Sequence, residues 1–222
     1  MTFPSAREVS CRRFPGDLPT ICNNCGKAKT QVETATVPLS SAARRTEVHT
    51  RTLALHVYRR EDDLFDIEGH LVDVKPISTE FHNSQRSAGE PVHDLRLRLT
   101  INRRLEVVAA ESKMDVGAYP YCSGVEPSFK ALEGLRIGPG WNRKVRERVG
   151  GGRGCTHLVE MLQQMATTAL QAVWSEDDGD SENASDPADR ELREGMIDSC
   201  YTYRSNSQFV KIHFPRHYQR DA

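Results

Sequence analysis

Apolar and polar residues alternate along four segments in the first half of the chain. The alternation is clearest at His93–Ile101, where Leu or Ile occupies every second position from Leu95 onward and polar residues stand between them. Similar patterns cover Leu53–Tyr58, Leu64–Val74 and Leu105–Glu111. Because side chains alternate between the two faces of a strand, these segments predict an antiparallel sheet with one apolar face and one charged face.

A helical period replaces the alternation after about Pro120. The segment Glu126–Leu135 is expected to form a short helix, and a second short helix is expected to end near Val149. The strongest pattern covers Thr156–Trp174, where apolar residues recur three or four positions apart, at Leu158, Leu162, Met165, Ala169 and Val173. Strands followed by helices predict an α+β fold class, an antiparallel sheet packed by a C-terminal helical layer.

One α+β domain is expected to cover residues 47–174, with other segments on both sides. Residues 1–46 show little periodicity and contain four prolines, which predicts a disordered arm. Residues 175–194 are so polar and charged that burial cannot offset the entropy lost on ordering, which predicts an acidic linker. Residues 195–222 are expected to form a C-terminal hairpin that packs on the domain.

Composition and charge narrow the class of protein. Hydrophobic residues make up 37% of the chain, below the roughly 45–50% of globular proteins. The net charge of −1 combines −7 on residues 175–194 with +6 elsewhere. The arginines are spread along the chain without interleaved aromatic residues, so no nucleic-acid partner is expected.

No apolar run approaches the roughly 18 residues that a membrane helix needs, and the N-terminus lacks the apolar segment of a secretory signal. A soluble, cytoplasmic protein without membrane contact is therefore expected. Homo-oligomerisation is left open.

The charged face of the predicted sheet carries the strongest chemical signal. Asp66, Glu68 and His70 project together at steps of roughly 6.5–7 Å, so that a carboxylate can orient the imidazole. Four further groups are expected on this face, namely Tyr58, Arg60, Arg96 and Arg98. Such a surface can perform acid–base chemistry on an anionic or phenolic substrate. The alternative is a solvated face whose opposite charges pair across strands.

A glycine-rich loop, Gly150–Gly154, comes directly before the long helix. Free backbone N–H groups at a helix N-terminus suit a phosphate or carboxylate, although neither a Walker loop nor a dinucleotide fingerprint is present. Cys155, His157 and Glu160 follow in or next to the first turn. They form an alternative metal-ligand set, although their spacing matches no standard zinc module. The other interpretation is a tight glycine turn followed by a small buried cysteine.

Cys22 and Cys25 form a CxxC pair without a second pair, which we interpret as incidental. The sequence contains no nucleotide fingerprint, PLP pattern or haem motif, so no cofactor is expected.

Several longer motifs, together with the tripeptide DSC at Asp198–Cys200, resemble a bacterial family known only as domain of unknown function 2889. They are YRREDDLFDIEGHLVD, GEPVHDLRLRLTI, LRIGPGW, GCTHLVEML and MATTALQ. The resemblance implies an association with bacteria that degrade aromatic compounds. The matching positions include Tyr58, Arg59, Asp66, Glu68, His70, His93, Asp94, Trp141, Cys155, His157 and Glu160.

The expected function is that of a small-molecule enzyme. It is a cofactor-independent lyase of the deformylation or decarboxylation type, acting on an aromatic or phenolic compound by side-chain acid–base catalysis. The expected catalytic residues are His70, Tyr58, Asp66, Glu68, His93 and His157. The expected substrate-binding residues are Arg59, Arg96, Arg98 and Trp141.

Two alternatives stay open, a metal-dependent enzyme that uses Cys155 and His157, and a non-catalytic protein-binding module. An enzyme is expected to bring His70, His93 and His157 into one pocket, whereas a flat charged face favours the binding module.

Overall fold

The computed structural model describes residues 40–81, 84–175 and 194–220. Most of the predicted N-terminal arm, including the CxxC pair, and most of the predicted acidic linker lie outside these residues. Contacts divide the chain into Met1–Arg45 and Thr46–Ala222. The fold below is that of the second unit.

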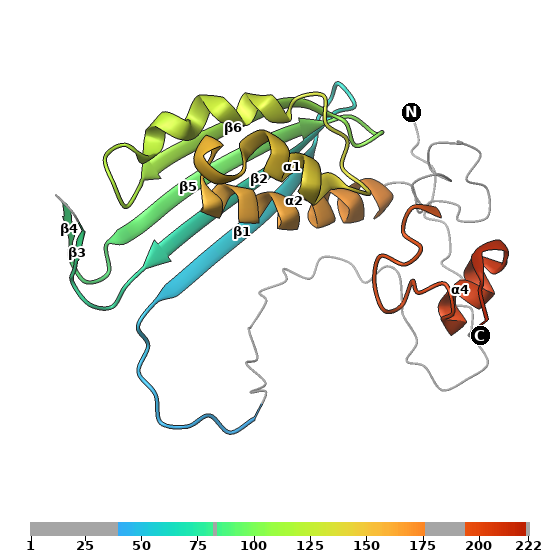
Figure 1. The fold of residues 1–222 in the computed structure, drawn as a ribbon, viewed down its shortest axis with the longest axis horizontal. Coiled ribbons are helices and arrows are strands. Elements are labelled where there is room, and N and C mark those ends of the chain that lie inside the picture. Colours follow the sequence, from blue (N-terminus) through green and yellow to red (C-terminus); the bar gives the residue numbers. More distant parts are fainter. Residues whose placement is uncertain (1–39, 82–83, 176–193, 221–222) are drawn as a thin grey trace, which may run out of the picture. The chain divides into compact units, whose positions relative to one another are not determined.

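Four long strands form one antiparallel sheet, as the alternation predicts (Figure 1). They are β1 (Thr50–Arg59), β2 (Phe65–Val74), β5 (Pro91–Ile101) and β6 (Val107–Val116), in the order β1-β2-β5-β6. Each strand lies within a few residues of its predicted position. Each of these four strands pairs antiparallel with the next one along the chain. The sheet is therefore a simple meander.

The chain forms a second, small hairpin after the end of β2 and before the start of β5. It consists of β3 (Thr79–Phe81) and β4 (Ser84–Arg86), which pair only with each other. Strands of three residues are too short to show an alternating pattern, so the sequence does not predict them.

A helical layer lies over one face of the sheet (Figure 1). It contains the 3₁₀-helices η1 (Cys122–Leu132) and η2 (Gly151–Arg153), and the α-helices α1 (Trp141–Val149) and α2 (Thr156–Ser175). The predicted short helix at Glu126–Leu135 is a 3₁₀-helix that contains Pro127. In the described part of the chain, no helix combines the length and the hydrophobicity needed to cross a membrane.

The core lies between the apolar face of the sheet and α2. In β5, Leu95, Leu97, Leu99 and Ile101 are all buried, whereas Arg96 and Arg98 are exposed. In α2, the predicted stripe is buried throughout, at Leu158, Leu162, Met165, Ala169 and Val173. The α+β fold class and the orientation of the sheet are therefore confirmed.

The helix and the sheet approach closely at Gly69 in β2. A Cβ atom at this position would collide with Met161 Sδ and lie 3.2 Å from Leu55 Cδ2. Met161 is fully buried. A side chain at position 69 would therefore push α2 away from the sheet.

The predicted C-terminal hairpin is wrong. Residues 194–220 contain no strand, and their regular elements are α4 (Gln208–His213) and the 3₁₀-helix η3 (Pro215–His217). Ser207 caps α4 by accepting a hydrogen bond from the Val210 N–H at 3.1 Å. This cap favours the helix over the extended conformation that the alternation suggests.

Candidate functional site

The structure divides the predicted catalytic residues between the two faces of the sheet. His70 points to the charged face, whereas His93 and His157 lie on the apolar side, where α2 packs. The three histidines therefore do not share one pocket, the arrangement that would have favoured an enzyme over a binding module. The physical reason is strand parity, since His93 is two residues from buried Leu95 and His70 is one residue from buried Leu71.

The charged face, here called the outer face, contains most of the predicted residues. We define it by Tyr58, Asp66, Glu68, His70, Asp94, Arg96 and Arg98. His70 Nε2 lies 2.7 Å from Asp94 Oδ1, so its carboxylate partner comes from the neighbouring strand β5. The predicted partners bind elsewhere, because Asp66 accepts from Thr100 Oγ1 at 2.7 Å and Glu68 accepts from Arg98 Nε at 2.8 Å.

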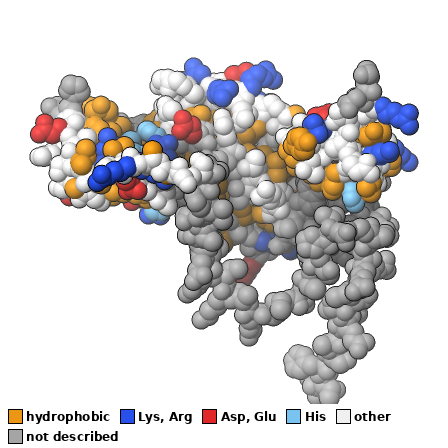
Figure 2. Space-filling model, turned by 90° about the horizontal axis from the view of Figure 1, so that it is seen from below, with side chains coloured by type: hydrophobic (Ala, Val, Ile, Leu, Met, Phe, Trp, Pro, Cys, Tyr) orange, Lys and Arg blue, Asp and Glu red, His pale blue; other side chains and the backbone are white. Residues whose placement is uncertain are grey.

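The cations of the outer face are paired with acids. Arg98 also donates to Glu111 at 3.3 Å, and Arg96 Nε donates to Asp115 at 3.1 Å. A depression of about 360 Å³ on this face is lined in part by His70, Arg96 and Arg98. Basic, acidic and histidine side chains also lie beside one another on the surface seen in Figure 2. These pairings agree with the alternative interpretation of a solvated face.

A second group of charged and titratable residues lies on the opposite side, at the edge of the core. We call it the Asp73 cluster and define it by His49, Arg51, Asp73, His93, Cys155, His157 and Glu160. Adjacent strands place Arg51, Asp73 and His93 side by side, because Asp73 in β2 pairs with Arg51 in β1 and with His93 in β5. The first turn of α2 contributes His157 and Glu160.

Asp73 is the centre of this cluster, and its side chain is only 1% exposed. Arg51 binds both carboxylate oxygens, with Nε 2.8 Å from Oδ1 and Nη2 2.8 Å from Oδ2. His49 Nε2 lies 3.1 Å from Oδ1, and His93 Nδ1 lies 2.9 Å from Oδ2. A carboxylate offers about four acceptor positions. All four are used.

These contacts fix the protonation of both partners. Burial alone would raise the pKa of Asp73, but the hydrogen bonds from Arg51, His49 and His93 outweigh it and hold this pKa well below its ordinary range. An ionised carboxylate can only accept hydrogen bonds. The proton between Asp73 and His93 therefore belongs to His93 Nδ1, which leaves the lone pair of the imidazole on Nε2.

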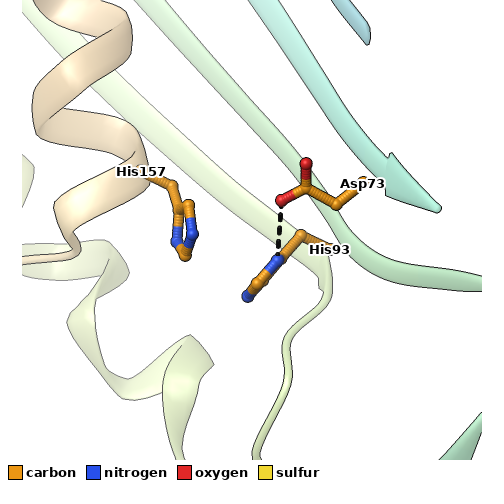
Figure 3. Close-up of side chains that lie close together, drawn as sticks. All are labelled: Asp73, His93 and His157. Atoms are coloured by element: carbon orange, nitrogen blue, oxygen red, sulfur yellow. Dashed lines mark hydrogen bonds and ion pairs between the residues drawn. The ribbon is translucent and has the colours of Figure 1, made fainter. Parts of the chain in front are cut away.

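His157 lies directly beside His93, as Figure 3 shows. The ring centroids are 4.1 Å apart, with an angle of 43° between the ring planes. Burial lowers the pKa of His157, and the positive charge of Arg51, together with that of His93 whenever this ring is protonated, lowers it further. The environment therefore favours the neutral form of His157.

Two further contacts connect the cluster. Cys155 Sγ lies 3.7 Å from His157 Nδ1, and Arg51 Nη1 donates to Glu160 Oε2 at 3.4 Å. The second contact joins the edge strand β1 to the N-terminal part of α2.

A comparison with protein families decides the relationship of the chain. The model of DUF2889, described as a protein of unknown function, matches residues 49–171. The chain belongs to the DUF2889 family. The match begins at His49 and includes every residue of the outer face and of the Asp73 cluster. No curated protein and no solved structure matches the chain.

Other predicted site residues of this DUF2889 chain lie away from both groups. Trp141 is a buried core residue, and its Nε1 donates to the Leu162 carbonyl at 3.3 Å. Trp141 also lines a cavity of about 920 Å³, and its role in substrate binding stays a prediction. Arg59 lies at the end of β1, where Nη2 donates to Asp63 at 3.1 Å.

The glycine-rich loop of the DUF2889 domain is a tight turn. Gly151 has a left-handed backbone with φ of 60°, and a Cβ atom at Gly150 or Gly154 would collide with the backbone carbonyl of Arg146 or Val149. These constraints explain three of the four glycines of the loop without a ligand, whereas Gly152 has open space at its Cβ position. Cys155 is half-buried and packs against the core, as the turn interpretation expects.

Among the described residues, one group could hold a metal ion, and it consists of Asp73, His93 and His157. One ligand atom from each lies within 4.8 Å of the other two. Of the predicted alternative ligands, only His157 belongs to this group, whereas Cys155 and Glu160 do not.

The sequence contained a signal for Arg51 and Asp73, which we did not predict. Each is two positions from an apolar residue on the buried face, Arg51 from Leu53 and Asp73 from Leu71. Charged residues that continue an apolar face indicate a polar cluster at the edge of a core.

Proposed function

We propose that this protein is a small-molecule enzyme in which Asp73 and His93 form a general-base pair. The observation that carries the proposal is the 2.9 Å hydrogen bond from His93 Nδ1 to buried, ionised Asp73. It leaves Nε2 as the proton acceptor, and the carboxylate stabilises the imidazolium that forms when Nε2 takes a proton.

The same chemistry is weaker at the outer face. There the His70 side chain is 34% exposed and its partner Asp94 is 23% exposed, whereas His93 is 15% exposed. Water screens an exposed pair more strongly than a shielded one, so the interaction between imidazole and carboxylate is stronger at His93. His93 therefore takes the role that the sequence assigns to His70.

His157 supplies a second, neutral imidazole beside the base. A neutral imidazole can accept or donate one proton, and its ring lies in contact with that of His93. When His93 is protonated, its charge disfavours a proton on His157. The pair of rings therefore takes up one additional proton more easily than two. This property suits successive proton transfers on one substrate.

The proposed reaction is that of a lyase of the deformylation or decarboxylation type, and the aromatic or phenolic substrate class comes from the sequence resemblance. A phenolate that carries a leaving group on its benzylic carbon expels that group and becomes a quinone methide. When the next carbon carries a hydroxymethyl group, the base takes the hydroxyl proton and the C–C bond to that group breaks. Formaldehyde leaves, and the bonding electron pair forms a C=C bond next to the ring and restores the aromatic phenolate. Loss of carbon dioxide from a carboxylate follows the same path of electrons.

A panel of phenolic compounds that carry a benzylic leaving group next to a hydroxymethyl or carboxylate side chain tests this proposal. Release of formaldehyde or carbon dioxide is measured for the wild type and for His93→Ala. The variant should lose roughly 10²–10⁴ in rate, the usual contribution of a general base. Wild-type rates in a folded His93→Ala protein would refute the role of His93.

A protein-binding module is the second candidate function. The observation that favours it is the outer face, whose charges are exposed and paired across strands. Such a face gives electrostatic specificity to a partner of complementary charge. In that case His93→Ala would change neither turnover nor binding.

A further inference from the structure

The Asp73 cluster also presents two imidazole lone pairs to the same space. We propose that His93 and His157 bind a divalent transition metal of the Zn²⁺ type, with Asp73 holding His93 in position. This inference goes beyond the proposed acid–base function. Because the metal takes the lone pair of His93 Nε2, bound Zn²⁺ inhibits proton transfer at this site instead of supporting it.

The distances suit a chelating pair of histidines. Ligand atoms of Asp73, His93 and His157 lie within 4.8 Å of one another, and the two rings are 4.1 Å apart. Two imidazole nitrogens on a tetrahedral zinc ion lie about 3.4 Å apart, given Zn–N bonds of about 2.0–2.1 Å. The contact between the two rings is therefore of the size that a shared metal ion requires.

Asp73 acts behind the ligand. Its four acceptor positions are taken by two nitrogens of Arg51, by His49 and by His93, so none is left for a metal. A carboxylate that accepts from one nitrogen of a histidine orients the other nitrogen toward the metal. The hydrogen bond from His93 Nδ1 to Asp73 has this arrangement.

The charges around the two histidines also suit a metal. Because Arg51 neutralises the charge of Asp73, the two histidines face the ion without a net negative charge. The site is therefore one of moderate affinity, with the remaining coordination positions open to water or to an anionic ligand.

Titration of the full chain with ZnCl₂ in the absence of substrate tests the inference. The background protein carries Cys22→Ser and Cys25→Ser, since that CxxC pair is a separate source of zinc ligands. Isothermal titration calorimetry should give one Zn²⁺ per chain. His93→Ala and His157→Ala should each abolish binding, and Asp73→Asn should weaken it by about 10–100-fold.

His70→Ala is the matched control, because His70 is also bonded to a carboxylate but lies on the opposite face. It should bind Zn²⁺ as the background protein does. Circular dichroism checks that each variant is folded. No saturable binding in the background protein, or equal binding after His93→Ala and His157→Ala, would overturn the inference.

The outcomes separate this inference from the proposed function. Zn²⁺ binding together with full turnover in His93→Ala would leave the metal site and reject the general base. Loss of turnover in His93→Ala, without Zn²⁺ binding in the background protein, would support the general base and reject the metal site.

Discussion

Folding removes the carboxylate of Asp73 almost completely from water. Burial of a charge is costly unless other groups replace its hydration. Here Arg51, His49 and His93 supply four hydrogen bonds, and the group stays ionised. The charge of Asp73 and the tautomer of His93 therefore depend on the same small set of side chains.

Replacement of Asp73 by Asn should destabilise the protein. The amide nitrogen cannot accept a hydrogen bond from Arg51, so we expect the free energy of unfolding at pH 7 to fall by about 1–3 kcal/mol. Urea unfolding of the wild type and Asp73→Asn measures this difference. An unchanged free energy of unfolding would show that Asp73 is not held as described.

The same pair of proteins gives a pH dependence. The pKa of Asp73 is lower in the folded state than in the unfolded state. Its stabilising contribution is therefore complete above the unfolded-state pKa and is lost as pH falls toward the folded-state pKa. The stability difference between wild type and Asp73→Asn should shrink between pH 7 and about pH 3, below the ordinary carboxyl pKa. A difference that grows on acidification would contradict this account.

The pKa of His157 is a second property of a single residue that can be measured. Burial lowers it, and the charges of His93 and Arg51 act in the same direction. In an NMR titration of the histidine rings, His157 should titrate below the ordinary histidine pKa. Arg51→Gln should move its pKa upward, because one of the nearby positive charges is removed. A His157 pKa above the ordinary value would contradict the environment described.

At the level of elements, the sheet and α2 depend on a close approach at Gly69. A methyl group at this position meets buried Met161, so Gly69→Ala should lower the free energy of unfolding by about 1–3 kcal/mol through overpacking. Gly124→Ala is a suitable control, since nothing lies within 4 Å of its added Cβ. Chemical denaturation compares the two variants. Equal stabilities would show that α2 lies farther from β2.

Strand parity explains how much of the fold could be predicted. Alternation placed β1, β2, β5 and β6 and oriented the sheet correctly, because burial of one face forces a period of two. The C-terminal prediction failed because one side-chain cap at Ser207 outweighed a weak alternation. The hairpin β3–β4 was missed because its strands are too short to show a period.

The candidate site was predicted only in part, for a related reason. Strand parity puts His93 on the buried face with Leu95. The prediction nevertheless placed the main site on the outer face, because more reactive side chains lie there. Contact between His93 and His157 depends on how α2 lies over the sheet, and that placement is a property of packing between distant segments. Asp73 was missed because its partners come from the strands on either side, Arg51 in β1 and His93 in β5, which only the register brings together.

For the molecule as a whole, the central claim is that chemistry takes place at the Asp73 cluster and not on the outer face. Both faces contain a histidine bonded to an aspartate, with His93 on Asp73 and His70 on Asp94. The two pairs lie on opposite sides of the same sheet, within the part of the chain that matches DUF2889. A variant of His70 is therefore a control for the same variant of His93 within one protein.

The most direct measurement is the ratio of kcat/KM for His93→Ala to that for His70→Ala, on the phenolic compound that the wild type cleaves fastest. The account predicts that His93→Ala is slower than His70→Ala by roughly 10²-fold or more, since only His93 is expected to act as the base. A folded His70→Ala protein that is as slow as His93→Ala, or slower, would contradict the assignment of the reaction to the Asp73 cluster.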